Sequence, residues 1–278
     1  MDRNTLHRII RPFLEEDVGR GDLTSESIFT PEDTGKARMV AREPFIAAGV
    51  DTVAAEVFKV QNSTIETRKA VADGAAVRPG ETVMVVNGPV IDLLKAERIA
   101  LNLLQRLCAI ATLTHQFVDK VKKSSARIVD TRKTTPGLRM LEKYAVRVGG
   151  GRNHRFNLAD GVLIKDNHIA ACGSITEAVN RVRRTIPHTL RIEVETDTYD
   201  QVEECLRCGV DIIMLDNMDV ATMGQAVKAI NGRALVEASG GIDVEMVENI
   251  AQTGVDFISV GGLTHSVRAC DIGMDWLE

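Results

Sequence analysis

The sequence has few aromatic side chains, and this shortage limits what the protein can bind. Only one Trp and two Tyr occur among its 278 residues. Proteins that bind single-stranded nucleic acids stack bases on such rings, and non-specific nucleic-acid binding also needs an excess of Lys and Arg. The formal net charge is -5, so we expect no nucleic-acid partner. A small anionic ligand is not excluded, because the field inside a pocket is local.

Long apolar runs and a disulfide framework are also missing. No apolar run approaches the roughly 20 residues that cross a bilayer. The segment MDRNTLHRIIRPFLEED lacks the apolar core of a signal peptide. We therefore predict a cytoplasmic protein with no membrane partner. The five Cys are odd in number and irregularly spaced, and Cys205 and Cys208 have no second pair or nearby His that would complete a zinc site.

Motifs for several kinds of chemistry are absent as well. There is no Ser–His or Cys–His arrangement, no HExxH motif and no Gly-x-Gly-x-x-Gly dinucleotide turn. The turn rhythm of residues 73–89 is similar to that of lipoyl and biotinyl carrier domains, yet no Lys lies between Lys69 and Lys95 to carry the group. A covalent nucleophile, a transition-metal centre and a carrier module are therefore disfavoured.

What the sequence does contain is a group of cations near the ends of two apolar strands. The strands are residues 127–129 and 161–165. The cationic or titratable groups are Arg132, Lys133, His154, Arg155 and Lys165. Cations clustered in this way can hold an anion. The alternative is a solvated charged surface, but solvated charges scatter around helices and do not follow apolar strands.

The first part of the chain mixes helices and strands. Residues 1–20 predict an amphipathic helix, 36–48 a strand, 51–60 a helix and 64–90 a β-rich segment. A short helix near residue 24 is expected to begin at a cap formed by Thr24 or Ser25. Residues 91–121 predict one long helix or two abutting helices. From spacing alone, Arg98 on this stretch is interpreted as a solvated helix residue.

Beyond residue 125, strand-like runs alternate with helical stretches. The runs are 127–129, 161–165, 191–195, 211–215, 234–238 and 256–260. Successive ends lie about 20 to 35 residues apart, the interval of βαβ units in a parallel α/β fold. Because no dinucleotide turn is present, these units favour a barrel over a doubly wound sheet.

Each predicted strand ends in polar residues or glycine, where the active site of an α/β barrel lies. Glu195 and Asp216 can bind ribose hydroxyls or Mg²⁺, face a positive charge on a sugar ring, or simply pair with a local cation. Glycines at the last two ends suit a phosphate but can also serve only as tight turns; they are Gly240, Gly241, Gly261 and Gly262, with Ser239 before the first pair. Transfer of a phosphorylated sugar to an acidic acceptor suits this combination.

These motifs resemble those of the quinolinate phosphoribosyltransferase family, the nicotinate-nucleotide pyrophosphorylases. The central match is TRKTTPGLR at 131–139, LEKYAV at 141–146, GGG at 149–151, NHR at 153–155 and LIKDNH at 163–168. Further matches are EVE at 193–195, MLDN at 214–217, EASGG at 237–241, ISVGGLTHS at 258–266, ED at 16–17, GDLT at 21–24 and ER at 97–98. The resemblance covers nearly the whole chain. Cys108, Ala109 and Gly262 depart from residues common in the family, but none is a charged site position.

The resemblance implies a fold and a reaction. The fold is an N-terminal α/β sandwich domain at 1–110 and an incomplete, seven-stranded α/β barrel at 111–265, the type II phosphoribosyltransferase fold. The C-terminal tail at 266–278 is expected to pack back on the first domain. In the reaction, a step of NAD biosynthesis, quinolinate and phosphoribosyl pyrophosphate give nicotinate mononucleotide, pyrophosphate and CO₂. The implied cofactor is Mg²⁺.

The resemblance also implies roles for the matching residues. Those expected to hold quinolinate are Arg98, Arg132, His154, Arg155 and Lys165. Those expected to hold phosphoribosyl pyrophosphate are Lys133, Glu195, Asp216, Ser239, Gly240, Gly241, Gly261 and Gly262. The expected catalytic residues are Lys133, Lys165, Glu195 and Asp216, of which the two acids would also hold Mg²⁺, directly or through water. Arg98 is expected to reach the partner subunit's site, which implies a homodimer with shared active sites.

Three alternatives stand beside this hypothesis. A paralogous phosphoribosyltransferase of the same fold, such as the one linked to molybdenum transport, is the nearest, but Arg132, Arg155 and Lys165 favour a dicarboxylate acceptor. The other phosphoribosyltransferase fold uses paired acids and a Thr-Gly loop, whereas residues 212–217 have one acid and no such loop. A non-catalytic anion-binding protein on a barrel would not require the combination of Lys133, Glu195 and Asp216.

Overall fold

The computed structural model describes residues 2–278, which form two compact units. The first unit comprises residues up to 115 together with Thr135–Gly150 and Ser266–Glu278. The second comprises Gln116–Thr134 and Gly151–His265. The chain therefore passes between the units more than once.

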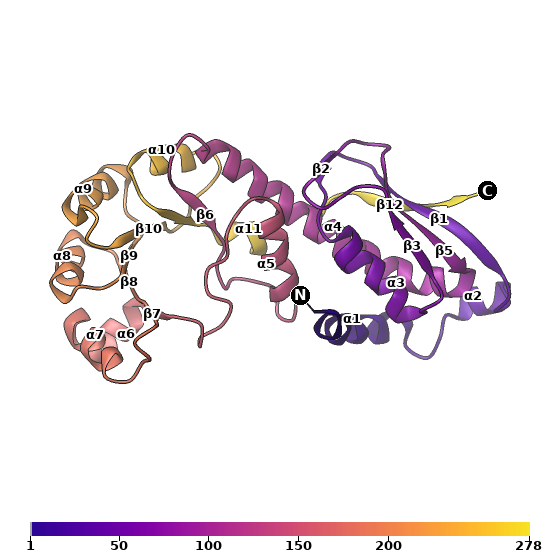
Figure 1. The fold of residues 1–278 in the computed structure, drawn as a ribbon, viewed down its shortest axis with the longest axis horizontal. Helices are drawn as coiled ribbons and strands as arrows, with labels where there is room; N and C mark the ends of the chain where they lie inside the picture. The colour runs from indigo at the N-terminus through magenta and orange to yellow at the C-terminus, as the bar shows by residue number, and fades with distance from the viewer. Residues whose placement is uncertain (1) are drawn as a thin grey trace. The chain divides into compact units, whose positions relative to one another are not determined.

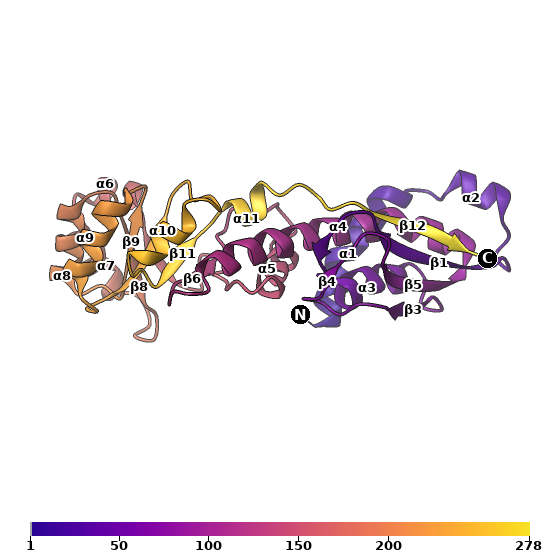
Figure 2. The same ribbon diagram turned by 90° about the horizontal axis from the view of Figure 1, so that it is seen from above.

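The first unit is built on a four-stranded antiparallel sheet. Its strands, in spatial order, are β12 (Ile272–Leu277), β1 (Thr34–Ala41), β5 (Thr82–Pro89) and β3 (Glu66–Lys69). The C-terminal strand β12 lies along β1, with Lys36 opposite Leu277 and Ala41 opposite Ile272 (Figure 2). Strands β2 (Phe45–Ile46) and β4 (Ala76–Val77) form a separate two-stranded ribbon.

The helices of the first unit follow the hydrophobic pattern of the sequence. The predicted N-terminal amphipathic helix is α1 (Arg3–Val18), which buries Leu6, Ile10 and Leu14 and packs on α3 (Ala55–Gln61). A π-helical turn, η1 (Val50–Ala54), precedes α3, and α5 (Arg139–Val148) also belongs to this unit. Residues 91–121 form one helix, α4 (Val90–Val121), and not two. Within residues 2–278, no helix combines the length and the apolar character that a membrane span needs.

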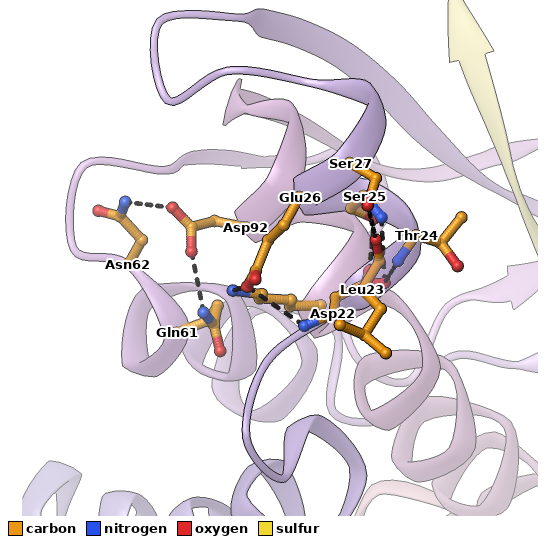
Figure 3. Close-up of polar contacts among 10 residues, drawn as sticks. Asp22, Leu23, Thr24, Ser25, Glu26, Ser27, Gln61, Asn62 and Asp92 are labelled. Atoms are coloured by element: carbon orange, nitrogen blue, oxygen red, sulfur yellow. Dashed lines mark hydrogen bonds and ion pairs between the residues drawn. The ribbon is translucent and has the colours of Figure 1, made fainter.

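Helix α2 (Leu23–Ile28) corrects one local prediction. Its cap is Asp22, whereas the sequence indicated Thr24 or Ser25. Asp22 Oδ1 accepts hydrogen bonds from the backbone N–H groups of Thr24 and Ser25, each at 3.1 Å (Figure 3). A carboxylate in this position satisfies donors that the first helical turn cannot pair, so the cap lies two residues before Thr24, the nearer of the two expected caps.

The second unit is built on a parallel sheet of six strands. In spatial order these are β6 (Arg127–Val129), β11 (Phe257–Ser259), β10 (Leu235–Ser239), β9 (Ile212–Asp216), β8 (Ile192–Thr196) and β7 (Val162–Ile164). All six predicted strands are confirmed, and no end differs from its prediction by more than one residue. The parallel pairing is that of repeated βαβ units.

The barrel formed by this sheet is open. Strands β6 and β7 are its edges, and they are not paired with each other in the described part of the chain. Arg152 instead forms an isolated parallel bridge to Val129, and its N–H donates to the carbonyl of Ile128 at 2.8 Å. The structure thus has six regular strands and one single-residue bridge, where the family resemblance implied seven strands.

Helices cover the outer side of the second unit's sheet (Figure 1). They are α6 (Asp166–Cys172), α7 (Ile175–Arg183), α8 (Tyr199–Cys208), α9 (Val220–Ile230) and α10 (Val247–Gln252). A short last helix, α11 (Gly262–His265), follows β11. Side chains alternate between the faces of a strand. Val194, Ile213 and Val236 are buried on the helix side. Their neighbours on the same strands therefore point to the inner side, and these include acidic residues.

Candidate active site

A cavity of about 340 Å³ opens at the carboxyl ends of the parallel strands. Strands β7 to β11 contribute residues to its lining, and so does the segment that follows β6. The lining residues are Thr131, Arg132, Lys133, His154, Arg155, Leu163, Lys165, Glu195, Met214, Asp216, Glu237, Ser239 and Ser259. This is the location that the strand-end pattern of the sequence predicted.

Most of the predicted site residues meet in this cavity. Those that line it are Arg132, Lys133, His154, Arg155, Lys165, Glu195, Asp216 and Ser239. The four predicted glycines follow β10 and β11 directly but are not among its lining residues. Arg98 is exposed on α4 in the first unit and is likewise not a lining residue.

Lys165 and Glu195 form an ion pair at the mouth of the cavity. Lys165 Nζ donates to Glu195 Oε2. The Lys165 side chain is 44% exposed, whereas that of Glu195 is 11% exposed. A partly exposed ion pair contributes little to stability. Lys165 can therefore exchange this partner for an anionic ligand at small energetic cost.

The backbone of Lys133 is fixed by its neighbours. Its N–H donates to Thr131 Oγ1 at 3.0 Å, and its carbonyl accepts from the hydroxyl of buried Thr264 at 2.7 Å. Its side chain passes over Gly261, where an added Cβ would lie 3.0 Å from Lys133 Cδ. The glycine after β11 therefore gives room for the lysine, whatever else it binds.

The loops after β9 and β10 approach each other closely. Gly240 has φ +97°, and a Cβ at this position would lie 2.2 Å from Asn217 Oδ1. The Asn217 N–H donates to the carbonyl of Ser239 at 3.0 Å, and Asn217 Nδ2 donates to Asp216 Oδ2 at 2.7 Å. Only glycine suits residue 240, because both its φ and its surroundings exclude a side chain. This contact fixes the orientation of the Asp216 carboxylate.

His154 lies against two buried acids at the inner side of the cavity, Glu193 and Glu237, to which the sequence analysis assigned no role. His154 Nε2 lies 3.0 Å from Glu193 Oε2 and 3.8 Å from Glu237 Oε1. Both acids are buried, and one oxygen of each, Glu193 Oε1 and Glu237 Oε1, has no hydrogen-bond partner within residues 2–278. Burial, reinforced by the charge of Glu193, raises the pKa of Glu237 to about 7. The spacing Glu-Val-Glu at 193–195 was the one available signal, since alternation puts both acids on the inner face.

Positive charge is concentrated around Arg155. Burial, and after it the nearby charge of Arg132, lowers the pKa of Arg155. Arg155 Nη1 donates to the carbonyl of Gly161 at 2.7 Å. Two guanidinium groups that repel each other in one cavity favour an anionic ligand that binds both.

Two family models cover nearly the whole chain. The model described as quinolinate phosphoribosyl transferase, N-terminal domain, matches residues 22–108, and the C-terminal domain model of the same description matches residues 110–275. The chain belongs to the quinolinate phosphoribosyltransferase family. The incomplete barrel and the strand-end cavity are therefore features of a family member.

Individual members of the quinolinate phosphoribosyltransferase family are similar to this chain over nearly its full length. The chain is 46% identical over 275 residues to the probable nicotinate-nucleotide pyrophosphorylase [carboxylating] of Bacillus subtilis, covering 99% of this chain and 94% of that protein. It is 45% identical to the nicotinate-nucleotide pyrophosphorylase [carboxylating] of Mycobacterium leprae, covering 96% and 95%. The crystal structure of NadC from Streptococcus pyogenes superposes with a TM-score of 0.94 at 38% identity, covering 100% of this chain and 99% of that one.

Proposed function

We propose that this protein transfers the phosphoribosyl group of phosphoribosyl pyrophosphate to quinolinate, with loss of CO₂. The products are nicotinate mononucleotide and pyrophosphate, and the reaction is a step of NAD biosynthesis. The observation that carries the proposal is the cavity itself, where Arg132, Lys133, Arg155 and Lys165 face Glu195 and Asp216. The names of the relatives in Bacillus subtilis and Mycobacterium leprae support the same activity.

Quinolinate carries two carboxylates on adjacent ring carbons, and we assign them to the cations. Arg132 and Arg155 offer planar donor groups that match carboxylates, and Lys165 adds a point charge. Burial, and after it the charge of Arg132, lowers the pKa of Arg155, and an anion that binds between the two guanidinium groups relieves their mutual repulsion. This relief favours a dianionic acceptor over a neutral pyridine.

The other side of the cavity suits phosphoribosyl pyrophosphate. Lys133 and Lys165 are assigned to the pyrophosphate, and Glu195 and Asp216 to the ribose hydroxyls. The 5′-phosphate is assigned to a set of small residues: Ser239, Gly240, Gly241, Gly261 and Gly262. The absence of a side chain at Gly240 and Gly261 allows close approach of their backbone.

The acids of the cavity fit Mg²⁺. Glu195 and Asp216 lie on the neighbouring strands β8 and β9, and oxygen donors from one or two carboxylates plus substrate phosphates are what Mg²⁺ prefers. We propose that these two residues hold Mg²⁺, directly or through water. When bound, the ion neutralises charge on the leaving pyrophosphate.

The chemistry then requires positioning more than a nucleophilic side chain. The ring nitrogen of quinolinate attacks the anomeric carbon while the bond to pyrophosphate breaks, and positive charge develops on the ribose. Glu195 and Asp216 stabilise this charge, and Lys133 and Lys165 stabilise the pyrophosphate. When the adjacent carbon–carboxylate bond breaks and CO₂ leaves, the electron pair stays on that ring carbon as a carbanion, which the positive charge of the new pyridinium stabilises and which then takes up a proton.

We also propose a homodimer in which Arg98 serves the site of the partner subunit. Arg98 is exposed on α4, and its charge acts on the neighbouring Glu97. Contacts at the base of the helix hold this part of the chain: Lys95 donates to Glu26 at 2.6 Å. Asp92 accepts from Gln61 and Asn62, as Figure 3 shows.

The activity is tested directly with purified protein, quinolinate, phosphoribosyl pyrophosphate and Mg²⁺. We expect release of CO₂ and pyrophosphate together with nicotinate mononucleotide. The variant Lys133→Ala should lose most of this activity, whereas Lys228→Ala, which removes an exposed lysine from α9, should keep it. Binding of both substrates without turnover would contradict the proposal.

The shared site is tested by mixing two inactive variants, Arg98→Ala and Arg132→Ala. Each hybrid dimer has one intact site, so random exchange of subunits leaves roughly a quarter of all sites active. The matched control mixes Arg132→Ala with Arg155→Ala. Both of these residues line the same cavity, so no hybrid site is intact. Equal activity of the two mixtures would exclude the proposed role of Arg98.

A further inference from the structure

The segment that carries Arg155 is held by side chains and not by a sheet or helix. Residues 153–155 belong to neither kind of element. The His154 N–H donates to Asp130 Oδ1 at 2.9 Å, and Asn153 Nδ2 donates to Asp130 Oδ2 at 2.6 Å. Asp130 is completely buried. The next N–H, that of Arg155, donates at 2.8 Å to Nδ1 of the His154 ring. Each backbone donor thus depends on one particular side chain.

These bonds define the tautomer of His154. Nδ1 accepts a hydrogen bond from a backbone N–H, so it carries no proton. The ring proton is therefore on Nε2, which donates to Glu193 Oε2 at 3.0 Å. The second buried acid, Glu237, lies 3.8 Å from the same nitrogen and favours a donor there. Both ring nitrogens are thus committed to the protein.

The same tautomer argues against a metal ion. The ligand atoms of His154, Glu193 and Glu237 lie within 4.8 Å of one another, which is close enough for a shared cation. A cation at this place would need a lone pair on Nε2. A neutral imidazole carries one proton on its two nitrogens. Because Nδ1 accepts a hydrogen bond from the N–H of Arg155, the proton is on Nε2, which therefore has no lone pair for a metal ion.

We propose that His154 is a positioning residue for Arg155 and does not itself bind the acceptor's carboxylate. Glu193 and Glu237 hold the imidazole in its Nε2–H tautomer, and Nδ1 then fixes the backbone of Arg155. A second bond, from Arg155 Nη1 to the carbonyl of Gly161 at 2.7 Å, orients the guanidinium. The remaining N–H groups of Arg155 are available to the ligand. This inference rests on the proposed function and replaces the role that the family resemblance implied for His154.

Two substitutions separate the two bonds of the imidazole. In His154→Asn, the side-chain oxygen lies near the position of Nδ1 and can still accept from Arg155. In His154→Gln, the amide nitrogen lies near the position of Nε2 and can donate to Glu193 or to a ligand, but the acceptor for Arg155 is lost. We expect the Kd for quinolinate to rise about tenfold in His154→Gln, the effect of one buried donor left unpaired, and only about threefold in His154→Asn.

The readouts distinguish positioning from direct binding and from general damage. The Kd for phosphoribosyl pyrophosphate should change little in either variant, and the melting temperature should fall by a similar few degrees in both, because each loses one hydrogen bond of the imidazole. If His154 bound the carboxylate through Nε2, the order would be reversed, and His154→Gln would keep the higher affinity for quinolinate. That reversed order, or an equal loss of affinity for both substrates, would overturn the proposal.

A spectroscopic test does not depend on turnover. The ¹⁵N chemical shifts of the His154 ring in the ligand-free protein should report a neutral imidazole with its proton on Nε2. The signal can be assigned among the six His of the chain by its loss in His154→Asn. An imidazolium, an Nδ1–H tautomer or a bound metal ion released by Glu193→Gln would overturn the inference. Because this result needs no catalysis, it remains decisive even if the proposed reaction is not observed.

Discussion

Glu193 and Glu195 lie two residues apart on β8 and point to the same side of the sheet, yet they have different surroundings. Glu195 pairs with Lys165, whose side chain is 44% exposed, at the cavity mouth. Glu193 is buried beside His154 and close to Glu237. We call Lys165, Glu195, Asp216 and Ser239 the outer level, and His154, Glu193 and Glu237 the inner level. Position along one strand thus gives the two carboxylates different roles. Glu195 at the cavity mouth can exchange its partner for a ligand, whereas buried Glu193 orients His154.

Removing a charge from the outer level should abolish activity without unfolding the protein. For Lys165→Ala we expect kcat/KM to fall about a hundredfold to a thousandfold, the loss typical of a group that stabilises developing charge. The melting temperature should change little, because the pair with Glu195 is partly exposed. Steady-state kinetics and thermal unfolding measure the two quantities. Lys228→Ala is the control, and a large loss of stability in Lys165→Ala would contradict the distinction between levels.

The inner level should make stability depend on pH. The pKa of Glu237 is raised from 4.5 to about 7, so the folded protein binds this proton more tightly than the unfolded chain does. The corresponding stabilisation is fully present below about pH 4.5 and is lost as the pH rises through about 7. Relative to Glu237→Gln, the wild type should therefore lose up to about 3 kcal/mol of unfolding free energy over this range. Urea unfolding at several pH values measures the difference.

The control for this pH effect is Glu248→Gln, which changes an exposed acid on α10. Its stability should follow that of the wild type at every pH. If Glu237→Gln also runs parallel to the wild type, the carboxyl group of Glu237 does not take up a proton on folding, and the inner level has a different electrostatic origin.

A side chain at residue 240 should separate the loops after β9 and β10 and so displace Asp216 and Ser239 of the outer level. In Gly240→Ala the new Cβ would lie 2.2 Å from Asn217 Oδ1, at a φ of +97°. We expect a loss of roughly 2 kcal/mol in stability from the strained conformation and a higher KM for phosphoribosyl pyrophosphate. Gly224→Ala on α9 is the control, because its Cβ would meet nothing within 4 Å. Equal behaviour of the two variants would show that the loop contact is unimportant.

The sequence was sufficient to predict the strands of the second unit but not their closure. Six apolar runs, each bounded by polar residues or glycine, predicted six strands to within one residue. Closure of the barrel depends on pairing between segments far apart in the sequence. The single bridge at Arg152 leaves no periodic pattern in the sequence that would predict it. The prediction of the cap of α2 was wrong for a local reason. Asp22, Thr24 and Ser25 are all good capping residues, and only the backbone conformation decides among them.

The outer level was predictable because its residues lie at the carboxyl ends of strands or directly after them. The inner level was not, although its residues stood within recognised motifs. His154 and Glu193 are 39 positions apart, and their contact depends on a fold that no local pattern specifies. The sequence analysis assigned a role to Glu195 and none to Glu193, because sequence position gave no measure of depth and no sign that Glu193 contacts His154. Positioning residues of this kind are found only when the packing around the site is known.

The smallest expected effect concerns the hydrogen bond that holds the backbone of Lys133 beside the cavity. In Thr264→Val the side chain keeps its shape but loses the hydroxyl that donates to the Lys133 carbonyl at 2.7 Å. A buried hydrogen bond of this kind contributes about 1 kcal/mol, which corresponds to a lower melting temperature by about 2–4 °C. The KM for phosphoribosyl pyrophosphate should rise a few-fold, because Lys133 is less well positioned. Thr264→Ser retains the hydroxyl and should retain the KM even if its lost methyl group lowers stability. A raised KM in Thr264→Ser as large as in Thr264→Val would mean that packing against α11, and not the hydrogen bond, positions Lys133.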